Sequence, residues 1–169
     1  MIYIVIKNLY YMGVRPDLAG FERNLKKALE SGGTELLNVV DQLLAPKPIL
    51  RVGDTTTTAY RRVHEILGSV LDFVIRAATE ITETTENQRK AEIANRLAIE
   101  LSRAKVIVNY QLARDQISQD IAMVLNHVLD SISNALRRGQ REAVRELAER
   151  GRALIDALAV FVYRHGRTR

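Results

Sequence analysis

The chain contains no cysteine, which excludes disulfide bonds and a thiolate metal site. Histidine is also scarce: His64, His127 and His165 are scattered along 169 residues, so no histidine cluster points to a bound metal. The sequence has no glycine-rich phosphate loop and no Ser-His-Asp, Cys-His or HExxH arrangement. We therefore expect a protein that is not an enzyme and needs neither metal nor cofactor.

Long hydrophobic runs are absent as well. The opening MIYIVIKNLYYMG is apolar but too short to cross a bilayer. It lacks the basic start and the small-residue cleavage site of a signal peptide. It could be a short strand, an added apolar cap, or a start upstream of a true first residue at Met12. We assign residues 1–16 to an N-terminal extension and expect a cytoplasmic protein without membrane contact.

Proline occurs only three times, at Pro16, Pro46 and Pro48, and never after the first third of the chain. Beyond Val52, apolar residues recur at the i, i+3, i+4, i+7 spacing of an amphipathic helix. The helices predicted from this spacing cover 17–30, 35–45, 54 to a break within 79–88, 86–114, 115–138 and 140–164. They predict an all-α fold: an antiparallel bundle of about four long helices, with one or two short N-terminal helices, in one domain over 17–169.

Capping residues mark several of the predicted helix ends. Asp17 and Thr34 are candidate N-caps for the two short helices, and Asp54 or a nearby threonine is one for the first long helix. Polar and β-branched residues in TEITETTENQ are expected to break or fray that helix. Gly139 is expected to separate the last two helices.

The charge is mildly basic, with 25 lysines and arginines against 20 acids and a net charge of +5. A basic chain favours anionic partners, and nucleic acid is the first of these. Because the excess is small, an anion site would require local clustering of the bases.

One cluster follows the predicted helix 86–114. Four arginines fall within about 40° of one another over about 37 Å of that helix: Arg89, Arg96, Arg103 and Arg114. A row of guanidinium groups can follow a phosphate backbone. The alternative is a solvated ladder of ion pairs, since Glu92 and Glu100 lie on the same face.

The second cluster lies in the last third of the chain, where all nine bases from Gln116 to Arg169 are arginines, against six acids. Arg138 and Arg141 lie near one helix face there. The planar guanidinium suits phosphate, because it can bind two oxygens at once. The alternatives are a general compositional preference for arginine and the favourable placement of bases at helix C-termini.

Three segments carry a resemblance to a known family. TTTAYRRV (56–63) resembles a Thr-Thr-x-x-x-Arg-basic-apolar segment that opens a helix. KVIVNYQLAR (105–114) resembles a Lys-x-x-apolar-x-Tyr-x-x-x-Arg segment on a following helix. LIDALAVFVYRHG (154–166) is similar to an acidic-Ala-apolar-x-x-aromatic stretch in a final helix. In this order, from about Thr55 to the C-terminus, they resemble the small subunit of the type III-A CRISPR interference (Csm) complex.

The resemblance implies a noncatalytic subunit of a ribonucleoprotein. In that family several copies stack as an inner filament, beside other subunits, and their basic side chains touch the phosphates of guide and target RNA. Here the residues expected to contact RNA are Arg61, Arg62, Arg103, Lys105, Tyr110, Arg114, Arg138 and Arg141. The chain departs from the family pattern at Ala59, at Val106 and Ile107 (in place of a typical Pro-Lys pair) and at Phe161 (in place of a tyrosine).

Two other interpretations remain open. A helical adaptor could dimerise through an apolar face without binding nucleic acid. The chain could also be the small subunit of a related type III-B or III-D complex, which shares the bundle.

Overall fold

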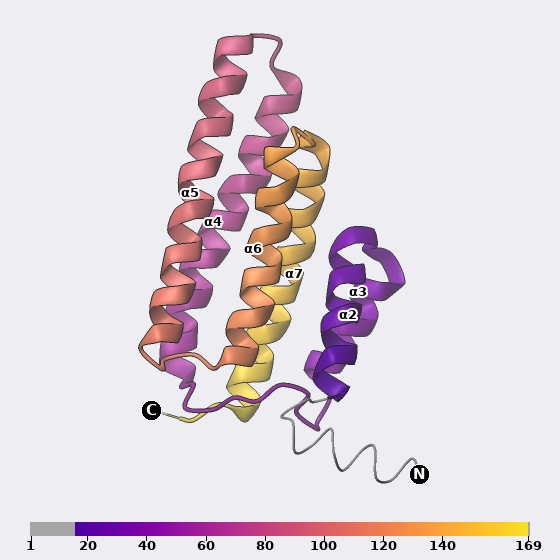
Figure 1. Cartoon of the computed structure of the whole chain (residues 1–169), viewed down its shortest axis with the longest axis vertical. Helices are drawn as coiled ribbons and strands as arrows, with labels where there is room; N and C mark the ends of the chain where they lie inside the picture. The colour runs from indigo at the N-terminus through magenta and orange to yellow at the C-terminus, as the bar shows by residue number, and fades with distance from the viewer. Residues whose placement is uncertain (1–15, 169) are drawn as a thin grey trace.

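The computed structural model describes residues 16–168, and within them it contains six helices and no strand (Figure 1). The helices are α2 (Pro16–Ser31), α3 (Gly33–Leu44), α4 (Thr57–Glu83), α5 (Asn87–Ala113), α6 (Gln119–Arg137) and α7 (Arg141–His165). The predicted all-α helical bundle, with four long helices and two short ones, is confirmed. The three alternatives for the opening segment lie outside the described residues. The described helices include none that is both long and apolar enough to cross a membrane.

The four long helices form a ring in which neighbours run antiparallel, because each is joined to the next by a short turn. Around the ring, α4 packs on α5, α5 on α6, α6 on α7, and α7 back on α4. Figure 1 shows α2 and α3 as a separate hairpin along one side of this ring. Among the other described helices, that hairpin packs on α7 and α6 and not on α4 or α5, so α5 lies on the far side of the molecule from it.

The last helix, α7, holds these parts together through its apolar face. Its fully buried residues face α4, α6 and the α2–α3 hairpin: Ala148, Leu154, Ile155, Leu158, Phe161 and Val162. Gly151 lies among them, and a Cβ built there would be 2.5 Å from Val128 Cγ1 of α6. The missing side chain therefore lets α6 and α7 approach closely.

Two arginines of α7 complete the docking of the hairpin by satisfying free carbonyls at helix ends. Arg150 donates to the backbone oxygens of Leu29, at 2.8 Å, and Glu30, at 3.1 Å, in the last turn of α2. Arg164 donates to the backbone oxygen of Leu44 at the end of α3. These two members of the arginine-rich last third thus have structural partners within the chain.

Near the start of α4, hydrogen bonds join three segments: residues 55–57, the α5–α6 turn and the C-terminal tail. The Thr55 carbonyl accepts the Arg167 N–H at 3.1 Å, and the Arg167 carbonyl accepts the Thr57 N–H at 3.0 Å. The buried Thr55 hydroxyl accepts the Ser118 N–H at 2.8 Å. The C-terminal tail is thereby fixed to the start of α4 and to the α5–α6 turn, which sets how α4 and α7 meet.

The start of α4 confirms one predicted cap, and its end lies within the predicted break at residues 79–88. Thr56 is the N-cap, and its hydroxyl accepts the Ala59 N–H at 3.1 Å. The helix continues past residue 79 to Glu83. Within it, the Thr79 hydroxyl donates to the Ile75 carbonyl, and the Thr82 hydroxyl donates to the Thr79 carbonyl. The break is confined to residues 84–86.

The prediction that the fifth helix, α6, starts at about residue 115 was wrong. Residues 114–118 form a turn in which Asp115 has a φ of 55°, and α6 begins at Gln119. Ser118 is the N-cap of α6, and its hydroxyl accepts the Ile121 N–H at 3.2 Å. A serine that caps a helix must itself lie outside the helical conformation, so the helix cannot include the preceding turn.

The predicted caps of the short helices were also wrong. The described part of α2 already includes Pro16, so Asp17 lies in its first turn, where its charge suits the helix dipole. In α3 the N-cap position is Gly32, with a φ of 63°, and Thr34 is inside the helix. Only glycine adopts that backbone conformation without strain.

Substituting Gly151 should test the close contact between α6 and α7. We expect Gly151→Ala to lower the free energy of unfolding by about 1–3 kcal/mol, because the added methyl overpacks against Val128. Gly20→Ala is the matched control, since the nearest atom to a Cβ there is 3.9 Å away. The control should raise stability by up to about 1 kcal/mol. Urea unfolding measures both, and a Gly151→Ala chain as stable as the parent contradicts the close approach.

Substituting Arg150 should test how the hairpin is docked. We expect Arg150→Ala to cost about 1–2 kcal/mol, since two helix-end carbonyls, one of them partly buried, lose a charged donor. Amide hydrogen exchange should then speed up most in α2. Arg145→Ala on the same helix is the control, because Arg145 is exposed and should change stability by less than about 0.5 kcal/mol. Equal losses of stability in Arg150→Ala and Arg145→Ala would show that the hydrogen bonds from Arg150 to the end of α2 contribute little.

Candidate functional site

The eight predicted RNA-contact residues do not form one surface. Arg61 lies at a pocket between α4 and α7, and Arg62 and Arg103 lie on the α4–α5 side. Lys105 lies on the α5–α6 side, and Tyr110 and Arg114 lie where the α5–α6 turn starts. Arg138 and Arg141 lie at the far end of the bundle. Two of the predicted residues lie beside a cavity: Arg61 lines the pocket between α4 and α7, and Arg141 lines a second cavity with Ile81, Lys90 and Gln140. The α4–α7 pocket is described first.

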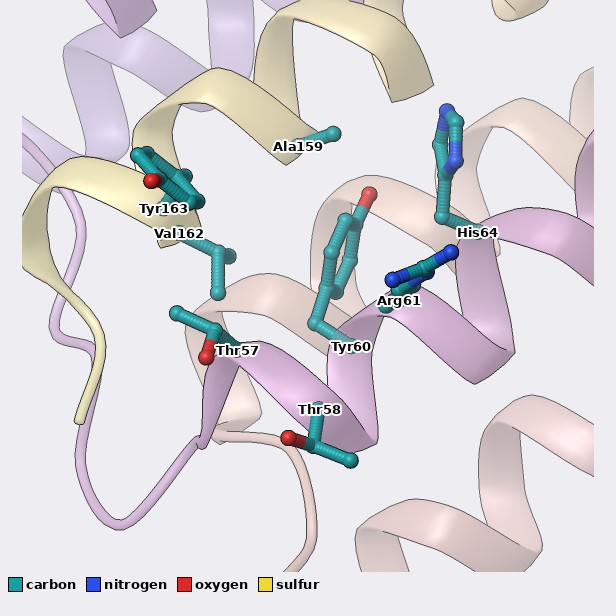
Figure 2. A pocket seen from close by; sticks show the side chains of 8 residues that line it. All are labelled: Thr57, Thr58, Tyr60, Arg61, His64, Ala159, Val162 and Tyr163. Carbon is teal, nitrogen blue, oxygen red and sulfur yellow. The ribbon is translucent and has the colours of Figure 1, made fainter. Parts of the chain in front are cut away.

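Arg61 lines a pocket of about 290 Å³ between the start of α4 and the end of α7 (Figure 2). The lining residues are Thr57, Thr58, Tyr60, Arg61 and His64 from α4, with Ala159, Val162 and Tyr163 from α7. The Arg61 side chain is 81% exposed and makes an ion pair with Glu65 at 3.0 Å on its own helix. An exposed pair of this kind is weak, so Arg61 can exchange this partner for another anion.

The floor of the pocket is apolar and fixed. Tyr60 is buried and donates its hydroxyl to the Ile155 carbonyl at 3.2 Å. Burial raises the pKa of Tyr60 far above its ordinary value, and the charge of Asp156 adds to this effect. Tyr60 therefore stays protonated at neutral pH and serves as a wall, not as a base.

One side of the pocket is held by a chain of charged groups. His64 Nε2 lies 2.7 Å from Asp156 Oδ1, and Arg152 also donates to Asp156. The same guanidinium donates to Asp72 at 3.2 Å, so it links α7 back to α4. Arg152 therefore bridges the two carboxylates Asp72 and Asp156, whereas Arg61 lines the pocket with an exposed side chain.

Tyr163 forms the opposite rim and is 82% exposed, the highest value among the large hydrophobic side chains of the described residues. Figure 2 shows Tyr163 on α7 and Arg61 on α4, on either side of Tyr60. The sequence prediction did not single it out, although it lies within the third family-like segment. The available signal was its position two residues after the buried Phe161, which turns it to the outer face of α7.

Arg62 points away from this pocket, because consecutive residues on a helix are about 100° apart. It shares a side of α4 with Phe73, eleven residues later, and Phe73 faces α5. Arg62 is exposed there. The two adjacent arginines of the first family-like segment therefore serve different surfaces.

The arginine row of α5 has partners along most of its length. Arg89 pairs with Glu80 of α4 at 2.6 Å, Arg96 stacks over the Phe73 ring at 5.5 Å, and Arg103 pairs with Glu100 at 3.0 Å. The hydrogen bond and charge of Glu80 raise the pKa of Arg89. This geometry matches the ion-pair alternative for the row more closely than a set of free phosphate contacts.

Lys105 lies on a different side of the helix from Arg103, since two residues correspond to about 200°. It forms an ion pair with Asp130 of α6 at 2.6 Å, and its side chain is 26% exposed. Lys105 therefore helps to join α5 to α6. Because Arg103 and Lys105 lie on different sides of α5, a phosphate backbone that follows one face of this helix would not contact both.

Tyr110 and Arg114 contact each other as their i, i+4 spacing predicts. Arg114 donates to the Tyr110 hydroxyl at 3.1 Å, and its guanidinium lies 5.4 Å from the ring centre. Arg114 is the C-cap residue of α5, which agrees with a helix-terminal role, and both side chains are exposed. A stacked arginine of this kind remains available to an anion from outside.

Arg138 and Arg141 lie at the other end of the bundle. Arg138 is the C-cap residue of α6 and Arg141 is the first residue of α7. The whole of α6, about 28 Å at 1.5 Å per residue, separates them from Arg114. The two exposed arginines could meet a long backbone but not the ligand that Arg61 meets.

Comparison with known proteins identifies no relative: no family model matches the chain, and no curated protein or solved structure is significantly similar to it. Among the described residues, no group of three or more His, Cys, Asp or Glu side chains could hold a metal ion. What the site can do must therefore be argued from the geometry of the α4–α7 pocket.

Proposed function

We propose that the chain is a noncatalytic subunit that binds the backbone of single-stranded RNA within a ribonucleoprotein. The observation that carries the proposal is the α4–α7 pocket, which an exposed arginine and an exposed tyrosine line together with the buried Tyr60. Such a site suits one nucleotide, with its phosphate at Arg61 and its base stacked on the Tyr163 ring.

The position of Arg61 supports an anion at this place. Arg61 is in the first turns of α4, a helix of 27 residues whose N-terminus is partly positive. Thr57 and Thr58, in the first turn of α4, line the same pocket. No base-specific group is arranged there, so we expect recognition of phosphate and ring shape rather than of sequence.

The three family-like segments extend the proposal to a particular assembly. They favour the small subunit of a type III-A CRISPR complex, or of the related type III-B or III-D complexes. In that role several copies lie side by side along guide and target RNA, next to the other subunits. The first segment contributes Arg61 to the pocket, and the third contributes Tyr163.

The second candidate function is a helical adaptor without nucleic acid, and one observation favours it. The outward face of α5 exposes Ile99, Val106 and Tyr110 to solvent. Binding of RNA and binding of a protein at α5 are compatible, because α5 and the pocket use different surfaces.

RNA binding to the pocket can be measured by fluorescence anisotropy with a labelled single-stranded RNA of mixed sequence, over a range of salt concentrations. Arg61→Ala should weaken binding and reduce the salt slope by about 0.7, the value for one phosphate contact on a single strand. Tyr163→Ala should cost about 1–3 kcal/mol of binding energy and leave the salt slope unchanged, because stacking is not ionic.

The matched controls separate the site from general charge. Arg76→Ala removes an exposed arginine from the same helix outside the pocket, and it should change binding much less. Tyr163→Phe should bind like the parent, because it keeps the stacking ring. If Arg61→Ala and Tyr163→Ala both bind RNA like the parent, the pocket is not the RNA site.

The absence of a recognisable catalytic set in the sequence predicts a separate result. The purified chain should not cleave RNA or DNA with magnesium, manganese or calcium, as judged by gel electrophoresis of labelled substrates. Cleavage that co-purifies with the chain through several columns, and that a single substitution abolishes, would show that it is an enzyme instead.

A further inference from the structure

The described residues expose seven large hydrophobic side chains, and their positions follow a pattern. Two of them, Val160 and Tyr163, are three residues apart on α7, and Tyr163 lines the pocket. The other five form two stripes on different helices: Leu37 and Leu44 on α3, and Ile99, Val106 and Tyr110 on α5.

The two stripes have the same spacing and opposite charges. On α3 the order is Leu37, Asp41, Leu44, which we call the α3 stripe; on α5 it is Ile99, Arg103, Val106, which we call the α5 stripe. In each, a charged residue at i+4 stands between apolar residues at i and i+7. Residues with this spacing share one helix face. All six are solvent-exposed, with Leu37 at 63% and Val106 at 68%.

The stripes lie on opposite sides of the molecule. The α3 helix packs on α2 and α7, whereas α5 packs on α4 and α6 and has no contact with α2, α3 or α7 among the described residues. Figure 1 shows α5 along one edge and the α2–α3 hairpin along the other. The stripes therefore cannot meet within one chain.

We propose that the α3 stripe of one copy binds the α5 stripe of the next. The leucines of α3 would pack on Ile99 and Val106, and Asp41 would pair with Arg103, which keeps Glu100 as its neighbour at 3.0 Å. A contact between two different faces is head-to-tail, and it gives an open row of copies unless the rotation closes a ring. The α3 and α5 stripes would be the surfaces through which copies associate in the proposed ribonucleoprotein. The contact itself does not depend on the proposed function; only the purpose of a row of copies rests on it.

A second copy fits these stripes better than other occupants. A lipid surface would disfavour Asp41 at the centre of the α3 stripe. An unrelated acidic helix could cover the α5 stripe but would leave the α3 stripe exposed. The chain itself supplies both halves with matched spacing and opposite charge. Because each stripe is small compared with a stable interface, the pair should be weak in dilute solution.

Crosslinking can detect such a contact, and the chain has no cysteine of its own. Leu37→Cys protein would be mixed, without RNA, with differently tagged Ile99→Cys or Val106→Cys protein and a short bis-maleimide. We expect mixed dimers to form at least about tenfold faster than with Arg76→Cys, because contact raises the effective concentration. Faster coupling of Leu37→Cys to Ile99→Cys would indicate that the two helices run parallel. Faster coupling to Val106→Cys would indicate that they run antiparallel.

Two results would overturn the proposal. Coupling of Leu37→Cys no faster than with the Arg76→Cys control excludes the contact. Faster coupling of Val106→Cys protein to itself than to Leu37→Cys protein shows a symmetric α5 contact instead. Neither result depends on RNA, so each is distinct from a failure of the pocket experiment.

Charge exchange tests the central pair. Asp41→Arg in the Leu37→Cys copy, or Arg103→Asp in the Val106→Cys copy, should slow coupling at least about tenfold through like-charge repulsion. Both changes together, one in each copy, should restore the rate. Glu83→Arg in the Leu37→Cys copy is the control and should leave it unchanged. Failure of the double exchange to restore coupling overturns the pairing of Asp41 with Arg103.

Discussion

The packing of α7 against the other helices is the interaction on which the rest of the structure depends. This helix contacts α4 and α6 within the ring and both helices of the hairpin outside it. Its apolar face supplies a large part of the core, and Arg150 and Arg164 cap α2 and α3. Since α7 is the last helix, the faces of α2, α3, α4 and α6 that pack on it are covered only when the end of the chain is in place.

The candidate site is a direct consequence of that packing. The pocket exists because the start of α4 and the end of α7, about a hundred residues apart in sequence, lie side by side. The pairing of the C-terminal tail with Thr55 and Thr57 fixes their relation, and the buried Tyr60 closes the floor. Arg61 and Tyr163 are therefore exposed groups on a rigid support, which suits binding better than a loop would.

The many arginines of the last third illustrate how one residue type serves two purposes. Arg150, Arg152 and Arg164 bind carbonyls or carboxylates of this chain, and Arg167 pairs with Asp54 at 2.7 Å. Each of these could also bind a phosphate by the same chemistry. Composition alone therefore overestimates the number of free arginines, because it does not include the acceptors that the fold places beside them.

The sequence by itself determined the class of fold, the number of long helices, the cap by Asp54 or a nearby threonine and the contact between Tyr110 and Arg114. All of these depend on neighbours within a few residues, where helical spacing fixes which side chains meet. It did not determine that Ser118 caps α6, that Arg61 and Arg62 face different partners, that Lys105 pairs with α6, or that Tyr163 and Arg61 line one pocket. Those depend on which helices pack together, and an amphipathic pattern states that a face is buried without stating against which partner.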